Sequence, residues 1–218
     1  MRLTRQQISD GVAKLGWRLI LGTVQAHVLT GSLAAGAEFA GRVAALPGAD
    51  GHVLLDVRDD RVVITVRTAE EDWVLPKDIE LAREITSVAE SLGLLVQAAG
   101  EPRVTQTIEI GIDALDIPKV RPFWKAVLGY VDSGPDAVTD PLSAGPAVWF
   151  QQMDAPRPQR NRIHFDVAMP AEEAQARIDA ALAAGGRLVY VDEAPAFWVL
   201  ADPEGNEACV CTWQGRDK

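Results

Sequence analysis

Residues 162–213, RIHFDVAMPAEEAQARIDAALAAGGRLVYVDEAPAFWVLADPEGNEACVCTW, decide the fold of the second half of the chain. Short runs rich in β-branched and aromatic residues predict strands at 162–167, 187–191, 197–200 and 208–213. A helix is predicted between the first two strands, at 172–184. The DPEGN segment at 202–206 reads as a tight turn that fixes the last hairpin, because Gly and Asn tolerate special backbone angles. The stretch therefore predicts one β-α-β-β-β unit.

The preceding residues repeat this order. A strand is predicted at 107–113, a helix at 120–128, and three further strands around Tyr130, around Ala137 and at 147–153. The second half thus predicts β-α-β-β-β twice. We expect the two copies to pair their sheets around a shared cleft, with Trp149, Phe197 and Trp198 as candidates to line it.

The first half has a different order of elements. Thr4 and Gln7 form a capping box, which predicts a helix from about residue 5 to 15. Strands are predicted at 17–21, 25–29, 52–57 and 62–68, with further helices after Ser32 and from Pro76. On the second of the three helices we expect four residues to share the apolar face: Leu33, Ala37, Ala40 and Val43. The order α-β-β-α-β-β-α can cover one face of an antiparallel sheet with helices.

A polar stretch with Gly and Pro at 97–103 separates the two halves. The predicted fold class is therefore α+β, with a small α-β-β-α-β-β-α antiparallel-sheet domain at residues 1–97. A second domain with paired βαβββ units is predicted at residues 104–218. Each part is close to the usual size of a small domain.

Composition narrows the classes of partner. The chain has 218 residues, and its formal net charge of −10 argues against nucleic acid and anionic membranes. It has no apolar run of the roughly 20 residues that a membrane span needs. Cys209 and Cys211 lie two apart on a predicted strand and bridge poorly there. We expect a cytoplasmic protein that binds a small molecule, with a homodimer as an option.

The run at 52–82, HVLLDVRDDRVVITVRTAEEDWVLPKDIELA, resembles the pterin-4a-carbinolamine dehydratases, and the resemblance covers about residues 3–95. The family has a His-His-Pro tripeptide, a third His and an Asp that opens the last helix. These positions fall on Gly51-His52-Val53, on Ala69 and on Asp78. The resemblance implies acid–base dehydration, in which imidazoles deliver and remove protons near neutral pH, and makes His52 and Asp78 the catalytic candidates.

Each of these residues also has a simpler, structural interpretation, as does Trp73. His52 begins a strand and need have no role. Asp78 is the third residue of a helix, where the helix dipole alone favours a carboxylate. Trp73 either stacks on a flat heterocycle or covers the end of the sheet.

Three motifs in the second half resemble the vicinal-oxygen-chelate superfamily, and in particular its small glyoxalase-like and bleomycin-resistance-like branch. They are Phe150-Gln151, NRIHFD at 161–166 and DPEGNEACV at 202–210. The resemblance covers about residues 105–214 and implies a glyoxalase-like fold. In metal-using members four side chains at the cleft bind one divalent ion, and the matching positions are Glu109, Gln151, His164 and Cys209.

This donor set is mixed. Glutamine is a weak ligand, and a thiol stands where a carboxylate is usual, so the set suits a hard octahedral ion poorly. We therefore expect no cofactor, with a divalent metal as the alternative. In the metal-free reading His164 hydrogen-bonds to Glu109, Arg162 or Asp166.

Three functions follow as hypotheses. The first is a pterin-4a-carbinolamine dehydratase-type lyase, a carbon–oxygen hydro-lyase with fewer imidazoles than its family, fused to a glyoxalase-like small-molecule-binding domain. The second is a non-catalytic protein that binds a flat or apolar small molecule. The third is a metal-dependent glyoxalase- or dioxygenase-type enzyme that uses the C-terminal cleft. Gly51 and Ala69 weigh against the first hypothesis, and Gln151 and Cys209 weigh against the third.

Overall fold

The computed structural model describes residues 3–71, 73–97, 107–156, 164–212 and 214–215. The chain divides into two compact units, Met1–Thr107 and Ile108–Lys218. The predicted linker falls almost wholly in 98–106, outside the described residues, as do Asn161, Arg162 and Ile163 of the NRIHFD motif. None of the helices in the described ranges has the length and apolar character to cross a membrane.

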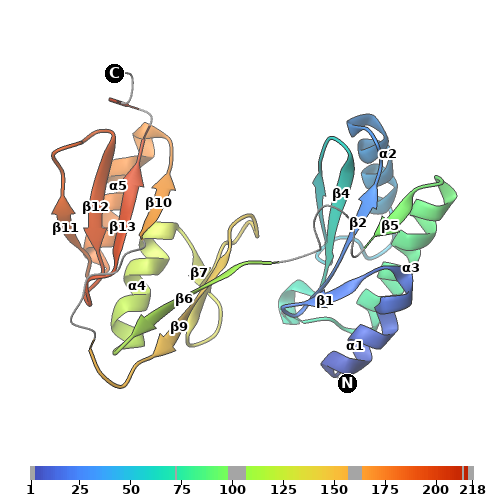
Figure 1. Ribbon diagram of the computed structural model, residues 1–218, viewed down its shortest axis with the longest axis horizontal. Coiled ribbons are helices and arrows are strands. Elements are labelled where there is room, and N and C mark those ends of the chain that lie inside the picture. The colour runs from blue at the N-terminus through green and yellow to red at the C-terminus, as the bar shows by residue number, and fades with distance from the viewer. Residues whose placement is uncertain (1–2, 72, 98–106, 157–163, 213, 216–218) are drawn as a thin grey trace. The chain divides into compact units, whose positions relative to one another are not determined.

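The N-terminal unit is a five-stranded sheet with helices packed on one face, as Figure 1 shows. Its elements are α1 (Arg5–Val12), β1 (Arg18–Ile20), β2 (Thr23–Leu29), α2 (Leu33–Ala44), β3 (Val53–Val57), β4 (Arg61–Val66), α3 (Pro76–Ser91) and β5 (Leu95–Gln97). The strand order is β1-β2-β4-β3, and β5 also pairs with β2. All of these pairs are antiparallel. The predicted order of elements is confirmed, and β5 is an addition to it.

Local signals start the helices where the sequence predicts. The Thr4 side chain accepts from the backbone N–H of Gln7, and the Gln7 side chain accepts from the backbone N–H of Thr4. At the start of α2 the Ser32 side chain accepts from the backbone N–H of Ala35, with no reciprocal bond. These contacts satisfy N–H groups that have no partner inside a helix.

The predicted apolar face of α2 is wrong in part. Its buried residues are Gly36, Phe39 and Val43, whereas Leu33 is 59% exposed. Phe39 offers the most apolar surface on this helix, and burying it sets the rotation of the helix. The absence of a side chain at Gly36 lets the helix approach β3, because a Cβ there would lie 3.1 Å from Val57.

The C-terminal unit contains the predicted repeat. The first copy has β6 (Glu109–Ala114), α4 (Ile117–Leu128), β7 (Val131–Asp132), β8 (Ala137–Thr139) and β9 (Ala147–Gln152). The second has β10 (Phe165–Ala168), α5 (Ala171–Ala183), β11 (Arg187–Tyr190), β12 (Phe197–Ala201) and β13 (Glu207–Cys211). Their sheets have the orders β6-β9-β8-β7 and β10-β13-β12-β11, and in each the first strand pairs in parallel with the last.

One apolar core joins the two copies on the helix side of the sheets. α4 packs against α5, and both contribute buried residues to the same cluster (Figure 1). Within it, the ring of Trp124 meets Phe123 and Phe165 edge to face, each at 5.4 Å between centroids. Because Phe165 belongs to β10 and Trp124 to α4, this aromatic contact holds the first copy to the second.

The DPEGN turn adds a polar clasp between the copies. Asp202 has no exposed surface, and its carboxylate accepts from the indole Nε1 of Trp124 at 3.0 Å. It also accepts from the backbone N–H groups of Glu204 and Asn206 and from the Asn206 amide. The predicted tight turn is therefore present, and its aspartate also reaches α4.

Glu204 extends the clasp from the same turn. Its carboxylate accepts from the backbone N–H groups of Leu115 and Asp116, at distances of 2.8 to 3.0 Å. These two residues directly precede α4, where a negative charge also interacts favourably with the helix dipole. A turn of the second copy thus caps a helix of the first.

Replacing Asp202 by alanine should destabilise the C-terminal unit. The substitution leaves the buried Trp124 N–H without an acceptor and frees the turn, so we expect a loss of about 2–4 kcal/mol in the free energy of unfolding. Urea denaturation of the full chain measures it. Asp179→Ala on the exposed side of α5 is the control and should change stability by no more than about 0.5 kcal/mol. Equal effects from the two variants would contradict the clasp.

Candidate functional site

His52 and Asp78 form a close pair in the N-terminal unit. Nδ1 of His52 lies 2.6 Å from Oδ1 of Asp78. The Asp78 side chain has no exposed surface, and that of His52 is 11% exposed. The structure thus brings together the two catalytic candidates of this half, from the start of β3 and from the first turn of α3.

The chain around Asp78 fixes its carboxylate. Oδ2 accepts from the hydroxyl of Thr68 at 2.9 Å and from the backbone N–H of Leu75 at 2.7 Å. Thr68 is itself held by a backbone hydrogen bond to the carbonyl of Trp73. Both carboxylate oxygens are therefore occupied, so Asp78 caps its helix and orients His52 at the same time.

The two ring nitrogens of His52 differ in their surroundings. Nδ1 faces the carboxylate, and the Thr68 hydroxyl lies 3.4 Å from the same nitrogen. Within the described ranges, no side chain or backbone group hydrogen-bonds to Nε2. Since an ionised carboxylate only accepts, Nδ1 carries a proton and Nε2 is the nitrogen that can exchange one.

Gly51 and Ala69, the positions to which the resemblance assigns two further histidines, lie near this pair. Gly51 directly precedes His52, and its carbonyl accepts from the backbone N–H of Ala69 at 3.3 Å. Gly51 has a φ of +75°, and a Cβ added there would meet no atom within 4 Å. A side chain at this position would have room but would strain the backbone.

Trp73 packs at the edge of the same loop. Its indole Nε1 donates to the backbone carbonyl of Leu3 at 3.2 Å. The guanidinium of Arg5 lies over the ring, 5.0 Å from its centroid. One face of the indole is thus covered by α1, which favours the reading in which Trp73 closes the end of the sheet.

A second group of reactive side chains lies in the C-terminal unit, on the sheet face away from the helices. It consists of His164, Asp166 and Cys209, whose ligand atoms all lie within 4.8 Å of one another. Nε2 of His164 is 3.4 Å from Oδ1 of Asp166. Of the predicted partners that the structure describes, Asp166 lies beside His164, whereas Arg162 is outside the described residues.

The register of two strands creates this group. Asp166 on β10 pairs directly with Cys209 on β13. Strand residues two apart share a face, so His164 projects on the same side as Asp166. Burial and the hydrogen bond to the Asp166 carboxylate raise the pKa of the Cys209 thiol to about 12. At neutral pH the thiol is protonated and donates to Asp166.

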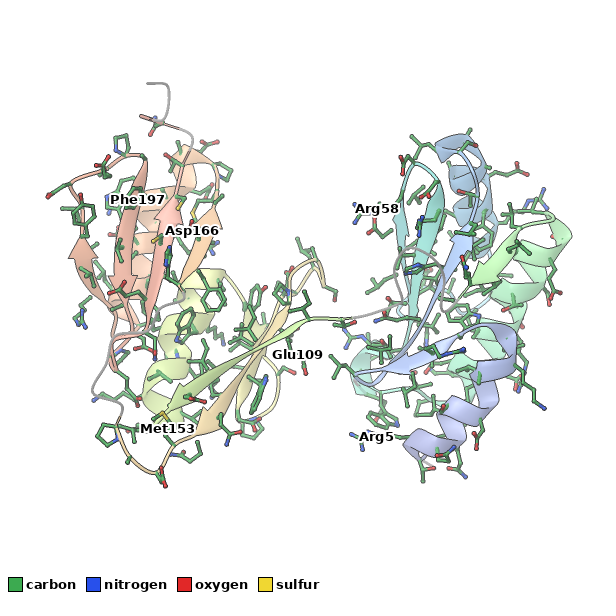
Figure 2. The ribbon with its side chains drawn as sticks, in the orientation of Figure 1. Arg5, Arg58, Glu109, Met153, Asp166 and Phe197 are labelled. Carbon is green, nitrogen blue, oxygen red and sulfur yellow. The ribbon has the colours of Figure 1, made fainter. Side chains whose placement is uncertain are left out.

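The other two candidate ligands lie on the first copy of the repeat. Glu109 begins β6, Gln151 is on β9, and both are exposed. Glu109 is not a member of the group formed by His164, Asp166 and Cys209. Figure 2 shows Glu109 well apart from Asp166. The structure therefore brings His164 and Cys209 together, adds Asp166 to them and leaves Glu109 outside the group.

The three donors fit a cation of intermediate softness. An imidazole, a carboxylate and a thiol are the ligand types that zinc takes in proteins. A hard octahedral ion such as Mg²⁺ prefers oxygen alone. These three side chains can therefore bind the divalent metal that the resemblance implies. They are softer ligands than those of the usual carboxylate-rich site.

Aromatic side chains on this unit divide between the two sheet faces. Trp149 is 38% exposed, and its ring lies over Gly111, where an added Cβ would be 3.2 Å from the indole. Phe197 stacks on Tyr190 at 6.1 Å between centroids. Trp198 packs against the core instead. Strand alternation explains this division, because Phe197 and Trp198 are consecutive residues of β12.

Thr68 is a member of the site around His52 and Asp78 that no sequence pattern predicted. Its place one residue before Ala69, a position that the resemblance already marks, was the signal that could have found it.

A groove of about 420 Å³ also lies along the outer side of α3, lined by residues that include Leu46, Arg83 and Val88. Neither His52 nor Asp78 lines it.

Solved structures resembling the chain include a glyoxalase/bleomycin resistance protein/dioxygenase family enzyme from Burkholderia phytofirmans PsJN. It is 19% identical with a TM-score of 0.39, and the match covers 48% of this chain and 95% of that chain. A genomically encoded fosfomycin resistance protein from Listeria monocytogenes is 13% identical with a TM-score of 0.41, over 50% of this chain and 94% of that chain.

For the N-terminal part, a transcriptional coactivator/pterin dehydratase from Brucella melitensis is 23% identical with a TM-score of 0.37. That match covers 41% of this chain and 99% of that chain. No curated protein matches the chain. The sequence model of a family described as a glyoxalase-like domain matches residues 109–211. Residues 109–211 thus form a glyoxalase-like domain.

Proposed function

We propose that the N-terminal unit is a pterin-4a-carbinolamine dehydratase-type lyase in which His52 is the acid–base group. The observation that carries this proposal is the His52–Asp78 pair, with one ring nitrogen held by a buried carboxylate at 2.6 Å. The substrate class comes from the resemblance of residues 52–82 to that family.

The pair suits proton transfer for a physical reason. Asp78 fixes the tautomer and the orientation of the ring through its hydrogen bond to Nδ1. Nε2 then donates a proton when the ring is charged and accepts one when it is neutral. An imidazole is effective in both directions near neutral pH, because its ordinary pKa lies there.

One imidazole is sufficient for a balanced reaction. In a 4a-hydroxytetrahydropterin, the bond between C4a and the hydroxyl oxygen breaks as Nε2 delivers a proton, and water leaves. The electron pair of the neighbouring ring nitrogen forms a C=N bond with C4a, and the proton on that nitrogen is lost. Neutral His52 then accepts this proton and returns to its protonated starting state. One imidazole can serve both transfers, because the hydroxyl oxygen and the ring nitrogen are bonded to the same carbon, C4a.

The rate should lie below that of a site with three histidines. Gly51 and Ala69 supply no acid–base group, and each positioned group typically contributes about 10²–10⁴-fold. A single imidazole must also serve both proton transfers in turn.

Replacing His52 by glutamine tests this proposal. We expect the full chain to accelerate loss of a chemically generated 4a-hydroxytetrahydropterin over buffer. His52→Gln should lower that acceleration at least about 100-fold, because no other imidazole is placed to move the protons. The assay follows absorbance of the pterin after mixing.

His27→Gln is the matched control, a second histidine of the same unit that lies on β2 and should leave the rate unchanged. Thermal unfolding of both variants checks that the fold is intact. A wild-type rate equal to buffer, or equal losses in the two variants, would contradict the proposal.

A second candidate function is small-molecule binding by the C-terminal unit. It is supported by Trp149, whose exposed ring lies over Gly111 on the sheet face away from the helices. Exposed Glu109 and half-buried Asp113 flank Gly111 along β6, on the same face. Such a surface offers a flat ring an aromatic partner, with acceptors at either side.

Planar probes test this second candidate. Pterin as a neutral ring and proflavine as a cation should quench tryptophan fluorescence of the full chain, since stacking brings the probe against Trp149. Trp149→Leu should weaken the binding about fivefold, which corresponds to the ~1 kcal/mol typical of an aromatic contact. Trp198→Phe, which changes a core-side ring, should leave the affinity unchanged. Binding that survives Trp149→Leu would refute this placement of the ligand.

A further inference from the structure

We infer that His164, Asp166 and Cys209 hold a divalent cation of the zinc type, with every protein ligand supplied by the second βαβββ copy alone. The ligand atoms of the three side chains lie within 4.8 Å of one another on two neighbouring strands. This site belongs to the C-terminal unit and stands independently of the lyase proposed for the N-terminal unit.

The strand pairing supplies a stable frame for the three donors. Asp166 and Cys209 are opposite each other in the parallel pair of β10 and β13. Cys209 is only 6% exposed, so its sulfur is fixed at the base of the group. His164 and Asp166 are 53% and 63% exposed and can adjust their rotamers above it.

The distances lie close to those of a coordinated ion. Zinc bonds of about 2.0–2.3 Å in a tetrahedron place neighbouring ligand atoms about 3.4–3.6 Å apart. Nε2 of His164 is already 3.4 Å from Oδ1 of Asp166. The remaining separations are at most 4.8 Å, so side-chain rotation suffices to close the site. Binding through the Cys209 sulfur requires that the thiol release its proton.

The donor types decide the kind of cation. A thiolate with an imidazole selects Zn²⁺ and Co²⁺ over Mg²⁺, because the softer ligands bind hard ions poorly. Three protein ligands leave the fourth tetrahedral position to solvent, and the exposure of His164 and Asp166 keeps that side accessible. Zinc with three protein ligands and one water is the arrangement of reactive zinc sites.

A cobalt titration of the full chain tests this inference directly. After treatment with a chelator, one equivalent of Co²⁺ should bind and produce the absorption band of a thiolate–cobalt bond. Cys209→Ser should remove the band, and His164→Ala should weaken Co²⁺ and Zn²⁺ binding at least about 100-fold, as should Asp166→Asn. Zn²⁺ should displace Co²⁺, and excess Mg²⁺ should not.

Matched variants distinguish this three-ligand site from a metal site whose ligands come from four strands. Glu109→Gln and Gln151→Ala should leave the affinity and the band unchanged, because neither residue belongs to the group. Cys211→Ser tests whether the other thiol on β13 supplies the band, and it should leave the band in place. Since His164 and Asp166 are surface side chains, their variants keep the test valid even where Cys209→Ser impairs folding.

Three results would overturn the inference. The first is the absence of stoichiometric Co²⁺ or Zn²⁺ at micromolar concentrations of free ion. The second is a loss of affinity in Glu109→Gln equal to that in His164→Ala, which would assign the ion to both copies of the repeat. The third is a thiolate band that survives Cys209→Ser.

Discussion

A buried carboxylate must fill its hydrogen-bonding capacity within the protein, and among the described residues each unit has one fully buried aspartate that imposes this constraint on the chain around it. Asp78 and Asp202 have no exposed surface. Asp78 ties the end of β4, the loop before α3 and the start of β3 to one point. Asp202 ties its own turn to α4. Removing either carboxylate therefore disturbs several segments at once.

For Asp78, this constraint joins structure to chemistry. The helix-dipole interpretation and the catalytic one are compatible, because one oxygen caps α3 while the other fixes Nδ1 of His52. A group held on both sides reorganises little during proton transfer, which is the property that acid–base catalysis needs. The hydrogen bonds of Asp78 that stabilise the fold therefore also hold His52 in its orientation.

Sequence patterns predicted the order of the elements well, because strand and helix periods and caps are local properties. Strand β5 was missed since Leu95–Gln97 is only three residues long and adjoins the polar linker. The buried face of α2 depended on how Phe39 and Gly36 meet the sheet, which no local pattern contains. Asp166 lies beside Cys209 because of the register between β10 and β13, which the sequence does not show. The family resemblance predicted Glu109 as a ligand instead.

The two groups of reactive side chains differ in ways that favour different chemistry. In the N-terminal unit the donors are fixed by burial, and the one accessible nitrogen of His52 suits proton exchange. In the C-terminal unit Cys209 is protonated at neutral pH, because burial and Asp166 raise its pKa to about 12, so it is a poor nucleophile there. Only displacement of its proton by a cation makes the sulfur a strong ligand. Exposed His164 and Asp166 can move to complete such a site, but exposure also makes them poor fixed partners for a proton relay.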